Sequence, residues 1–258
     1  MLPRAQALIA ARAREVLEAD FAARKLVDFD GPHGFEYSAV ASGRTKPVQV
    51  TPAATGRLRV VLPLLELRVP FELPLAALDD VDRGADDLPL DEVATAARQL
   101  AELEDRTVFY GVEQAGIVGL YSGSSQPKLS LPSDFRELPD AIAAALAQLQ
   151  IAGVAGPYAI ALDRASYLAF LGSTGPGGYP TLQHIRKLVD GPTVLAPSLD
   201  GALVVSLRGG DFVLTVGQDA SVGYESHDRE KVRLFLEETL TFRLLSPEAV
   251  VPLVSRRT

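Results

Sequence analysis

The stretch KPVQVTPAATGRLRVVL, residues 46–62, places two runs of alternating polar and apolar residues on either side of the segment TPAATG. Alternation with a period of two is typical of β-strands, and proline and glycine between two such runs indicate a hairpin. Neither run is apolar enough to supply a core of its own. The stretch therefore predicts an extended β-hairpin arm that projects from a larger body.

Two amphipathic helices are expected, one before the arm and one after it. Residues 3–23 and residues 91–110 both repeat apolar residues at helical spacing, and such apolar stripes must be buried against another element. The carboxylates Glu102, Glu104 and Asp105 on the second helix are expected to pair with arginines of that helix. The two stripes consist of Leu8, Ile9, Ala13, Val16, Leu17 and Phe21, and of Val93, Ala97, Leu100, Leu103 and Val108.

A different pattern runs from residue 123 to residue 198. Predicted helices (PDAIAAALAQLQ, DRASYLAFL and TLQHIRKLV) alternate there with predicted strands (YAIAL and TVLAP), which indicates a compact α/β lobe. Strands are predicted on both sides of it, at KPVQV and GRLRVVL before and at ALVVSLRG, DFVLTV and KVRLFLEETLTFRLL after. The order favours a lobe inserted into a first domain over two domains in tandem.

Composition excludes several classes of protein. The 258 residues carry 33 acidic and 25 basic side chains, a net charge of -8, which argues against a general nucleic-acid binder. The apolar runs are too short to span a membrane, and no secretory signal is recognised, so a cytoplasmic protein is expected. The absence of cysteine excludes disulfides, thiolate metal sites and cysteine nucleophiles.

The sequence shows no set of residues suited to catalysis. Ser226, His227 and Asp228 are consecutive, and adjacent side chains of an extended segment point to opposite faces, so they cannot form a catalytic relay. The other two histidines, His33 and His184, lack the spacing of a zinc or di-iron site. We expect no catalytic residue, no metal and no cofactor.

We assign no catalytic or phosphate-binding role to two glycine-rich stretches. The loop GSTGPGGYP, residues 172–180, has glycine and tyrosine where a phosphate-binding loop requires lysine and serine or threonine. The stretch RGGDFVLTVGQDASVGY, residues 208–224, is interpreted as scaffold: a buried strand between glycine turns, with its aspartates as turn caps.

Seven stretches together carry a family likeness: ARKLVDFDGPHGFEY, LDDVDRGADDL, LAELEDRTVFYG, AGPYAIAL, GGYP, LRGGDFVLTVGQDASVGY and VRLFLEETLTFRLLSPEA. In this order and over nearly the whole chain, they resemble encapsulin shell proteins, the bacterial nanocompartment proteins formerly described as linocin-type bacteriocins. The resemblance implies an α+β protein with the Hong Kong-type tailed-phage major capsid fold.

The resemblance also implies a division of the chain. The peripheral domain would comprise residues 1–43 with the first helix, residues 69–122 with a long spine helix, and the C-terminal strands of residues 199–258. The extended loop would be the arm, residues 44–68, and the axial domain the lobe, residues 123–198.

The implied function is that of a self-assembling shell subunit of an icosahedral nanocompartment in the bacterial cytoplasm. Closure would take multiples of sixty copies. The shell would enclose a cargo enzyme, a dye-decolourising peroxidase or a ferritin-like iron-storage protein, through a short C-terminal targeting peptide, with no nucleic-acid or membrane partner. The implied cargo-docking residues are Leu17, Phe21, Arg24, Val27, Asp28, Asp219 and Val222, and the implied five-fold pore loop contains Ser173, Thr174, Gly175, Gly177, Gly178 and Tyr179.

Two alternatives stay open. One is a phage major capsid protein, for which portal and terminase genes would be expected as neighbours, in place of peroxidase or ferritin-like genes. The other is a hydrolase or bacteriocin, which would need a nucleophile, a base and an acid in one place. Three isolated histidines do not offer that set.

Overall fold

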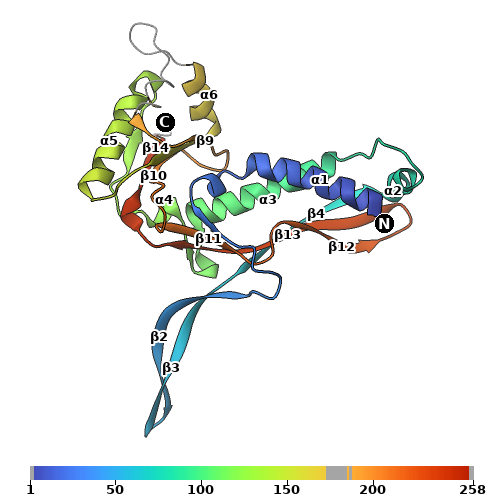
Figure 1. The fold of residues 1–258 in the computed structure, drawn as a ribbon, viewed down its shortest axis with the longest axis horizontal. Helices are drawn as coiled ribbons and strands as arrows, with labels where there is room; N and C mark the ends of the chain where they lie inside the picture. The colour runs from blue at the N-terminus through green and yellow to red at the C-terminus, as the bar shows by residue number, and fades with distance from the viewer. Residues whose placement is uncertain (1–2, 173–184, 186–187, 256–258) are drawn as a thin grey trace.

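The computed structural model describes residues 3–172, 185 and 188–255 (Figure 1). An elongated body contains a five-stranded sheet with two long helices lying along it. A lobe with a second five-stranded sheet stands at one end of the body, and a two-stranded arm projects away from both.

The first sheet is organised around one long strand. Strand β13 (Lys231–Leu244) pairs antiparallel with β4 (Leu65–Pro74) along one edge. Its other edge pairs antiparallel with two strands, one after the other along its length: β12 (Ser221–His227) and β11 (Phe212–Val216). Strand β1 (Asp28–Asp30) pairs parallel with β11. Residues 65–68, which were expected to belong to the arm, are the first residues of β4. They belong to this sheet because their alternating pattern continues directly into the buried residues Val69 and Phe71.

Helices α1 (Pro3–Asp20) and α3 (Asp91–Tyr110) cover one face of this sheet, with the shorter α2 (Leu75–Asp82) at its far end (Figure 1). The predicted stripes are buried except for Leu8, which is partly buried, and Leu103, which is 40% exposed. Helix α3 begins with Asp91 and Glu92, whose charges favour a helix N-terminus, and Gly111 follows its last residue as the C-cap. Gly111 has a φ of 82°, and a Cβ there would lie 2.3 Å from the carbonyl oxygen of Ile117, so only glycine fits. No helix among the described residues is long and apolar enough to span a membrane.

The lobe is built on the second sheet, whose strand order is β7 (Leu129–Leu131), β14 (Val250–Ser255), β10 (Ala202–Ser206), β8 (Tyr158–Leu162) and β9 (Thr193–Leu195). Helices α5 (Leu138–Ile151) and α6 (Arg164–Gly172) are the predicted helices of the lobe. The predicted helix TLQHIRKLV falls largely outside the described residues. Short elements complete the fold: β5 (Gly111–Val112), η2 (Glu113–Ala115), β6 (Ile117–Val118), α4 (Leu120–Gly123), η3 (Phe135–Glu137) and η5 (Pro247–Ala249).

Strands β10 and β14 differ from the expected division of the chain. The resemblance assigned the residues of both to the peripheral domain, as part of residues 199–258, but β10 pairs with β8 and β14 pairs with β10, so both belong to the sheet of the lobe. Every residue of β10 is buried. A strand that is apolar on both faces has no alternation to indicate which sheet it joins.

The arm is the predicted hairpin. Strands β2 (Ala39–Thr51) and β3 (Ala54–Pro63) pair antiparallel from Ala39 to the turn, so the hairpin begins five residues before residue 44. In the described part of the chain the two strands pair only with each other. An isolated two-stranded hairpin is marginally stable in water, so a contact with another molecule would stabilise the arm.

Candidate functional site

A groove of about 660 Å³ runs beside α1 and is closed on its other side by the start of β12. Leu17, Phe21, Val222 and Leu236 give it an apolar lining. Small side chains keep it open, because alanine occupies four lining positions: Ala10, Ala11, Ala13 and Ala220. The arrangement suits a short, extended, apolar segment of another molecule.

The structure brings most of the predicted docking residues together. Leu17, Phe21, Arg24, Asp219 and Val222 all line this groove. The other two, Val27 and Asp28, line a separate cavity of about 70 Å³. There the Asp28 carboxylate accepts a hydrogen bond from the Gly210 N–H at 2.6 Å, a contact that joins β1 to the turn before β11. The predicted pore-loop residues, 173–175 and 177–179, lie outside the described residues.

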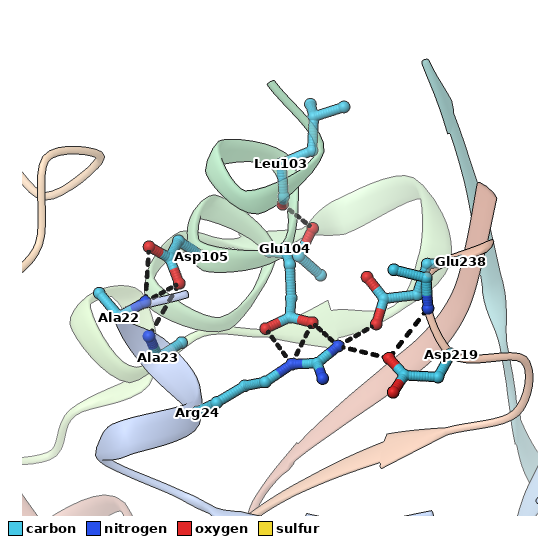
Figure 2. A network of polar contacts seen from close by, with 10 residues as sticks. Ala22, Ala23, Arg24, Leu103, Glu104, Asp105, Asp219 and Glu238 are labelled. Atoms are coloured by element: carbon cyan, nitrogen blue, oxygen red, sulfur yellow. Dashed lines mark hydrogen bonds and ion pairs between the residues drawn. The ribbon is translucent and has the colours of Figure 1, made fainter. Parts of the chain in front are cut away.

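Arg24 lines the groove and also meets three carboxylates (Figure 2). A 3-10 helix, η1 (Ala23–Lys25), places this side chain. Its Nη2 donates to Glu104 at 2.7 Å, to Asp219 at 2.9 Å and to Glu238 at 2.5 Å. The Phe21 ring stacks on the guanidinium, with 3.8 Å between the Arg24 Cζ and the ring centroid. One side chain thus links η1 with α3, β13 and the loop after β11.

Burial makes the charges of this cluster interdependent. Burial disfavours the charged guanidinium, but the hydrogen bond and charge of Glu104, with Glu238 and Asp219, hold the pKa of Arg24 above its usual range. Burial raises the pKa of both Glu104 and Glu238, which are fully buried. The nearby charge of Glu104 raises the pKa of Glu238 further. The charge of Arg24 acts in the opposite direction and lowers the pKa of both carboxyl groups.

A neighbouring carboxylate holds η1 in position. Asp105 Oδ1 accepts the backbone N–H groups of Ala22 at 3.1 Å and Ala23 at 2.8 Å (Figure 2). Ser198 Oγ lies 3.4 Å from Oδ2 of the same carboxylate. Burial, with the charge of Glu104, raises the pKa of Asp105 to about 7. Asp105 thus caps the turn that aims Arg24 into the groove.

We expect Asp105→Asn to change how stability depends on pH. The folded state retains the Asp105 proton up to about pH 7, whereas an unfolded chain releases it near 3.8, so this group stabilises the wild type less as the pH rises between these values. An asparagine carbonyl can still accept both N–H groups and does not titrate. Thermal unfolding of both proteins should show the wild type losing about 2–3 kcal/mol relative to the variant from about pH 5 to about pH 8. A difference that stays constant with pH would contradict this expectation.

The role of the carboxylates on α3 corrects the sequence interpretation. Glu104 and Asp105 were expected to pair with arginines of the same helix, but they bind Arg24 and the backbone of Ala22 and Ala23. The sequence did indicate that Glu104 is buried. Glu104 lies four residues from Leu100 and from Val108, so it shares their buried stripe. The residues around Glu238 gave no such indication, and its ion pair with Arg24 was not predicted.

The two stretches that were considered for chemistry have structural contacts. Ser226 and His227 are the last residues of strand β12, where Tyr224 Oη and His227 Nδ1 lie 2.6 Å apart. Asp228 accepts N–H groups of the turn between β12 and β13. Asp211 pairs with Arg208 at 2.9 Å, as scaffold. Asp219 is more than a turn cap, because it lines the groove and binds Arg24. Among the described residues, no group of three or more histidines and carboxylates could hold a metal ion.

Sequence comparison identifies relatives over nearly the full chain. A family model described as "Encapsulating protein for peroxidase" matches residues 2–241. The type 1 encapsulin shell protein of Rhodospirillum rubrum is 48% identical over 257 residues, covering 97% of this chain and 92% of the relative. That of Mycobacterium tuberculosis is 44% identical over 250 residues, covering 96% of this chain and 94% of the relative.

Structure comparison places the fold among capsid proteins. The virus-like particle from Pyrococcus furiosus matches with a TM-score of 0.68 at 15% identity, covering 95% of this chain and 97% of that chain. The capsid of Myoviridae phage XM1 matches with a TM-score of 0.56 at 12% identity, covering 88% and 89%. These similarities show the Hong Kong-type capsid fold, and the closer sequence relatives are encapsulins rather than phage proteins. The chain therefore belongs to the family of type 1 encapsulin shell proteins.

Proposed function

We propose that copies of this chain assemble into a closed icosahedral shell, in multiples of sixty, and that the groove beside α1 faces inward and binds a C-terminal peptide of a cargo enzyme. The observation that carries the docking proposal is the apolar groove of about 660 Å³, into which Leu17, Phe21 and Val222 converge. The arm, which has no core of its own, supports assembly because its exposed apolar side chains need a partner.

A peroxidase is the cargo that we favour over a ferritin-like protein. The description of the matching family names a peroxidase as the encapsulated protein. The groove fits a peptide with small and aliphatic side chains, since alanines line it beside Leu17 and Leu236. The shell itself would perform no chemistry and would act in the bacterial cytoplasm by confining the reaction of its cargo.

The remaining assignments follow the family. Residues 173–175 and 177–179 would rim an opening at each five-fold axis, through which ions and small molecules pass. The body would be the peripheral domain, the lobe the axial domain, and the β2–β3 arm the extended loop. The additional strands of the lobe, β10 and β14, extend the axial domain beyond residues 123–198.

Co-expression with a bacterial dye-decolourising peroxidase tests both parts of the proposal. We expect hollow, spherical particles of megadalton mass by native mass spectrometry and electron microscopy, with or without the peroxidase. The peroxidase should co-purify only if its C-terminal segment is intact. A stable monomer or dimer at micromolar concentration would exclude the shell, and equal co-purification without the segment would exclude peptide docking. If a ferritin-like protein is co-expressed as well, its loading with the peroxidase left outside would reverse the choice of cargo.

A further inference from the structure

The cluster around Arg24 places one positive charge against three carboxyl groups. Nη2 of Arg24 contacts Glu104, Asp219 and Glu238, so the cluster would carry a net charge of -2 if all three were ionised (Figure 2). Glu104 and Glu238 are both 0% exposed, and a buried charge without a partner is costly. A further positive charge is therefore needed close to these two side chains.

The basic side chains of the surrounding elements do not supply that charge. On η1, Lys25 is exposed, and its Nζ donates to a backbone carbonyl at the end of α1. On α1, Arg14 pairs with Glu18 at exposed positions. Arg68 of β4 pairs with Glu237, which points to the opposite face of the sheet from its neighbour in β13. In the described part of the chain, no group of three or more histidines and carboxylates could hold a metal ion. A proton is the cation that remains.

The contacts of the two glutamates show where a proton fits. Both oxygens of Glu104 accept hydrogen bonds from Arg24, whereas Glu238 accepts only one, through Oε1. Glu238 Oε2 is buried and has no donor within hydrogen-bond distance among the described residues, so nothing stabilises a negative charge on it. Glu104 and Glu238 lie within hydrogen-bond reach of each other, and two carboxyl groups can share a hydrogen bond only if one carries a proton. Asp105, also buried on α3, adds negative charge beside Glu104 and strengthens this requirement.

The buried glutamates are coupled to the groove through the side chains that they hold. Arg24 and Asp219 line the groove, and the Phe21 ring stacks on the guanidinium of Arg24. We propose that Glu104 and Glu238 share one proton while a cargo peptide is docked, and that loss of this proton weakens docking. Two adjacent ionised carboxylates repel each other around a single guanidinium, so the lining that rests on Arg24 loses its shape. This inference rests on the proposed docking function and adds its regulation by pH.

Burial sets the direction of the pH dependence. A docked apolar peptide covers Arg24 and Asp219 and keeps water further from the glutamates that they contact. Removal of water raises the pKa of a carboxyl group, so the pair retains its proton to a higher pH with the peptide bound than without it. Docking is therefore tightest below both of these pKa values and weakens as the pH rises through them. Release of one proton limits the loss of affinity to about tenfold per pH unit.

Tryptophan fluorescence can follow docking inside intact particles, because the shell chain contains no tryptophan. The probe is a tryptophan-free carrier protein that ends in the C-terminal segment of a dye-decolourising peroxidase, with one tryptophan placed in that segment. It is loaded into particles by co-expression. A docked tryptophan is immobile and surrounded by apolar side chains, which gives high anisotropy and blue-shifted emission. In wild-type particles both should decline as the pH rises from about 6 to about 9.

Two variants of adjacent residues assign this decline. Glu238→Gln keeps a donor in place of the proton and does not titrate, so the tryptophan should stay docked over the whole range. Glu237→Gln is the matched control, because the same substitution lies one residue earlier on the other face of β13, and it should follow the wild type. Asp105 titrates in all three proteins, so its contribution does not distinguish them.

Infrared difference spectroscopy of empty particles tests the proton without a cargo. The carbonyl band of a buried, protonated carboxyl group should disappear between neutral and alkaline pH. Asp105→Asn particles should retain this band, because Asp105 no longer contributes to the spectrum and the remaining proton belongs to Glu104 and Glu238. In Glu238→Gln particles the band of the pair should be missing. Absence of a protonated carboxyl band from Asp105→Asn particles would overturn the proposal even if Glu238→Gln fails to fold.

The remaining outcomes separate this inference from the docking function. The same decline of fluorescence anisotropy in Glu238→Gln and in the wild type would overturn the role of the pair. Docking that does not change with pH in the wild type would overturn the linkage and leave the docking site standing. Intact particles that never load the carrier would refute docking in the groove, and with it the regulation proposed here.

Discussion

Arg24→Met is expected to lower the thermal unfolding temperature of the particle by about 10 °C, the largest effect on stability that we predict for an exchange of one side chain. The substitution leaves Glu104 and Glu238 fully buried without the cation that both bind. Removal of one partner from a buried ion pair costs about 3–5 kcal/mol. For a chain of this size, each kcal/mol corresponds to about 2–4 °C. Differential scanning calorimetry on purified particles measures the shift.

Two further variants show whether the loss comes from the unpaired carboxylates. Arg233→Met removes an exposed partner of Glu72 and should change the unfolding temperature little, because exposed ion pairs contribute about 0–1 kcal/mol. Adding Glu104→Gln and Glu238→Gln to Arg24→Met should recover more than half of the loss, since neutral side chains need no cation. A loss from Arg24→Met no larger than that from Arg233→Met would contradict the role assigned to the cluster.

The cluster explains how a groove with few large side chains keeps its shape. Phe21 rests on the Arg24 guanidinium, and the guanidinium is held from α3, from β13 and from Asp219. Asp105 fixes the backbone of Ala22 and Ala23 between Phe21 and Arg24. The apolar lining is thus positioned by polar contacts, in which the carboxyl groups of Glu104, Asp105 and Glu238 are buried. Such an arrangement gives a preformed site, which reduces the entropic cost of binding.

The sequence predicted the helices and strands better than the way in which the strands pair into sheets. Period-two alternation identified the arm and most strands, and helical spacing identified α1 and α3, because local burial leaves a local pattern. The sheet that β10 and β14 join could not be predicted, since both are buried runs whose partners are chosen by tertiary packing. The boundary between β3 and β4 was also missed, because the alternation of polar and apolar residues continues across it.

The residues of the groove and of the Arg24 cluster were also predicted only in part. Resemblance to a known family indicated Leu17, Phe21 and Val222, which line the groove. Glu104 and Glu238 were missed because a buried charge depends on a partner distant in sequence, here 80 and 214 residues from Arg24. No local pattern of polar residues encodes such a partnership. Only Glu104 could have been found from its own neighbours, through its place in the buried stripe of α3.

Ala11→Trp is expected to reduce cargo loading by about 10–100-fold while leaving the particle intact. Ala11 is exposed on α1 and lines the groove, so an indole at this position occupies space that the peptide needs. Exclusion of one large apolar side chain of the cargo from the groove costs about 1.5–3 kcal/mol, which corresponds to this range. The measurement is the ratio of peroxidase to shell protein in purified particles after co-expression.

Ala19→Trp is the matched control, because Ala19 is also exposed on α1 but does not line the groove. Both variants replace alanine by tryptophan on the same helix, so any general effect on helix stability or particle solubility should be shared. Normal loading in Ala19→Trp and lost loading in Ala11→Trp would locate docking in the groove. Equal loss in both would point to a disturbed helix, and full loading of intact Ala11→Trp particles would mean that the cargo peptide binds elsewhere on the shell.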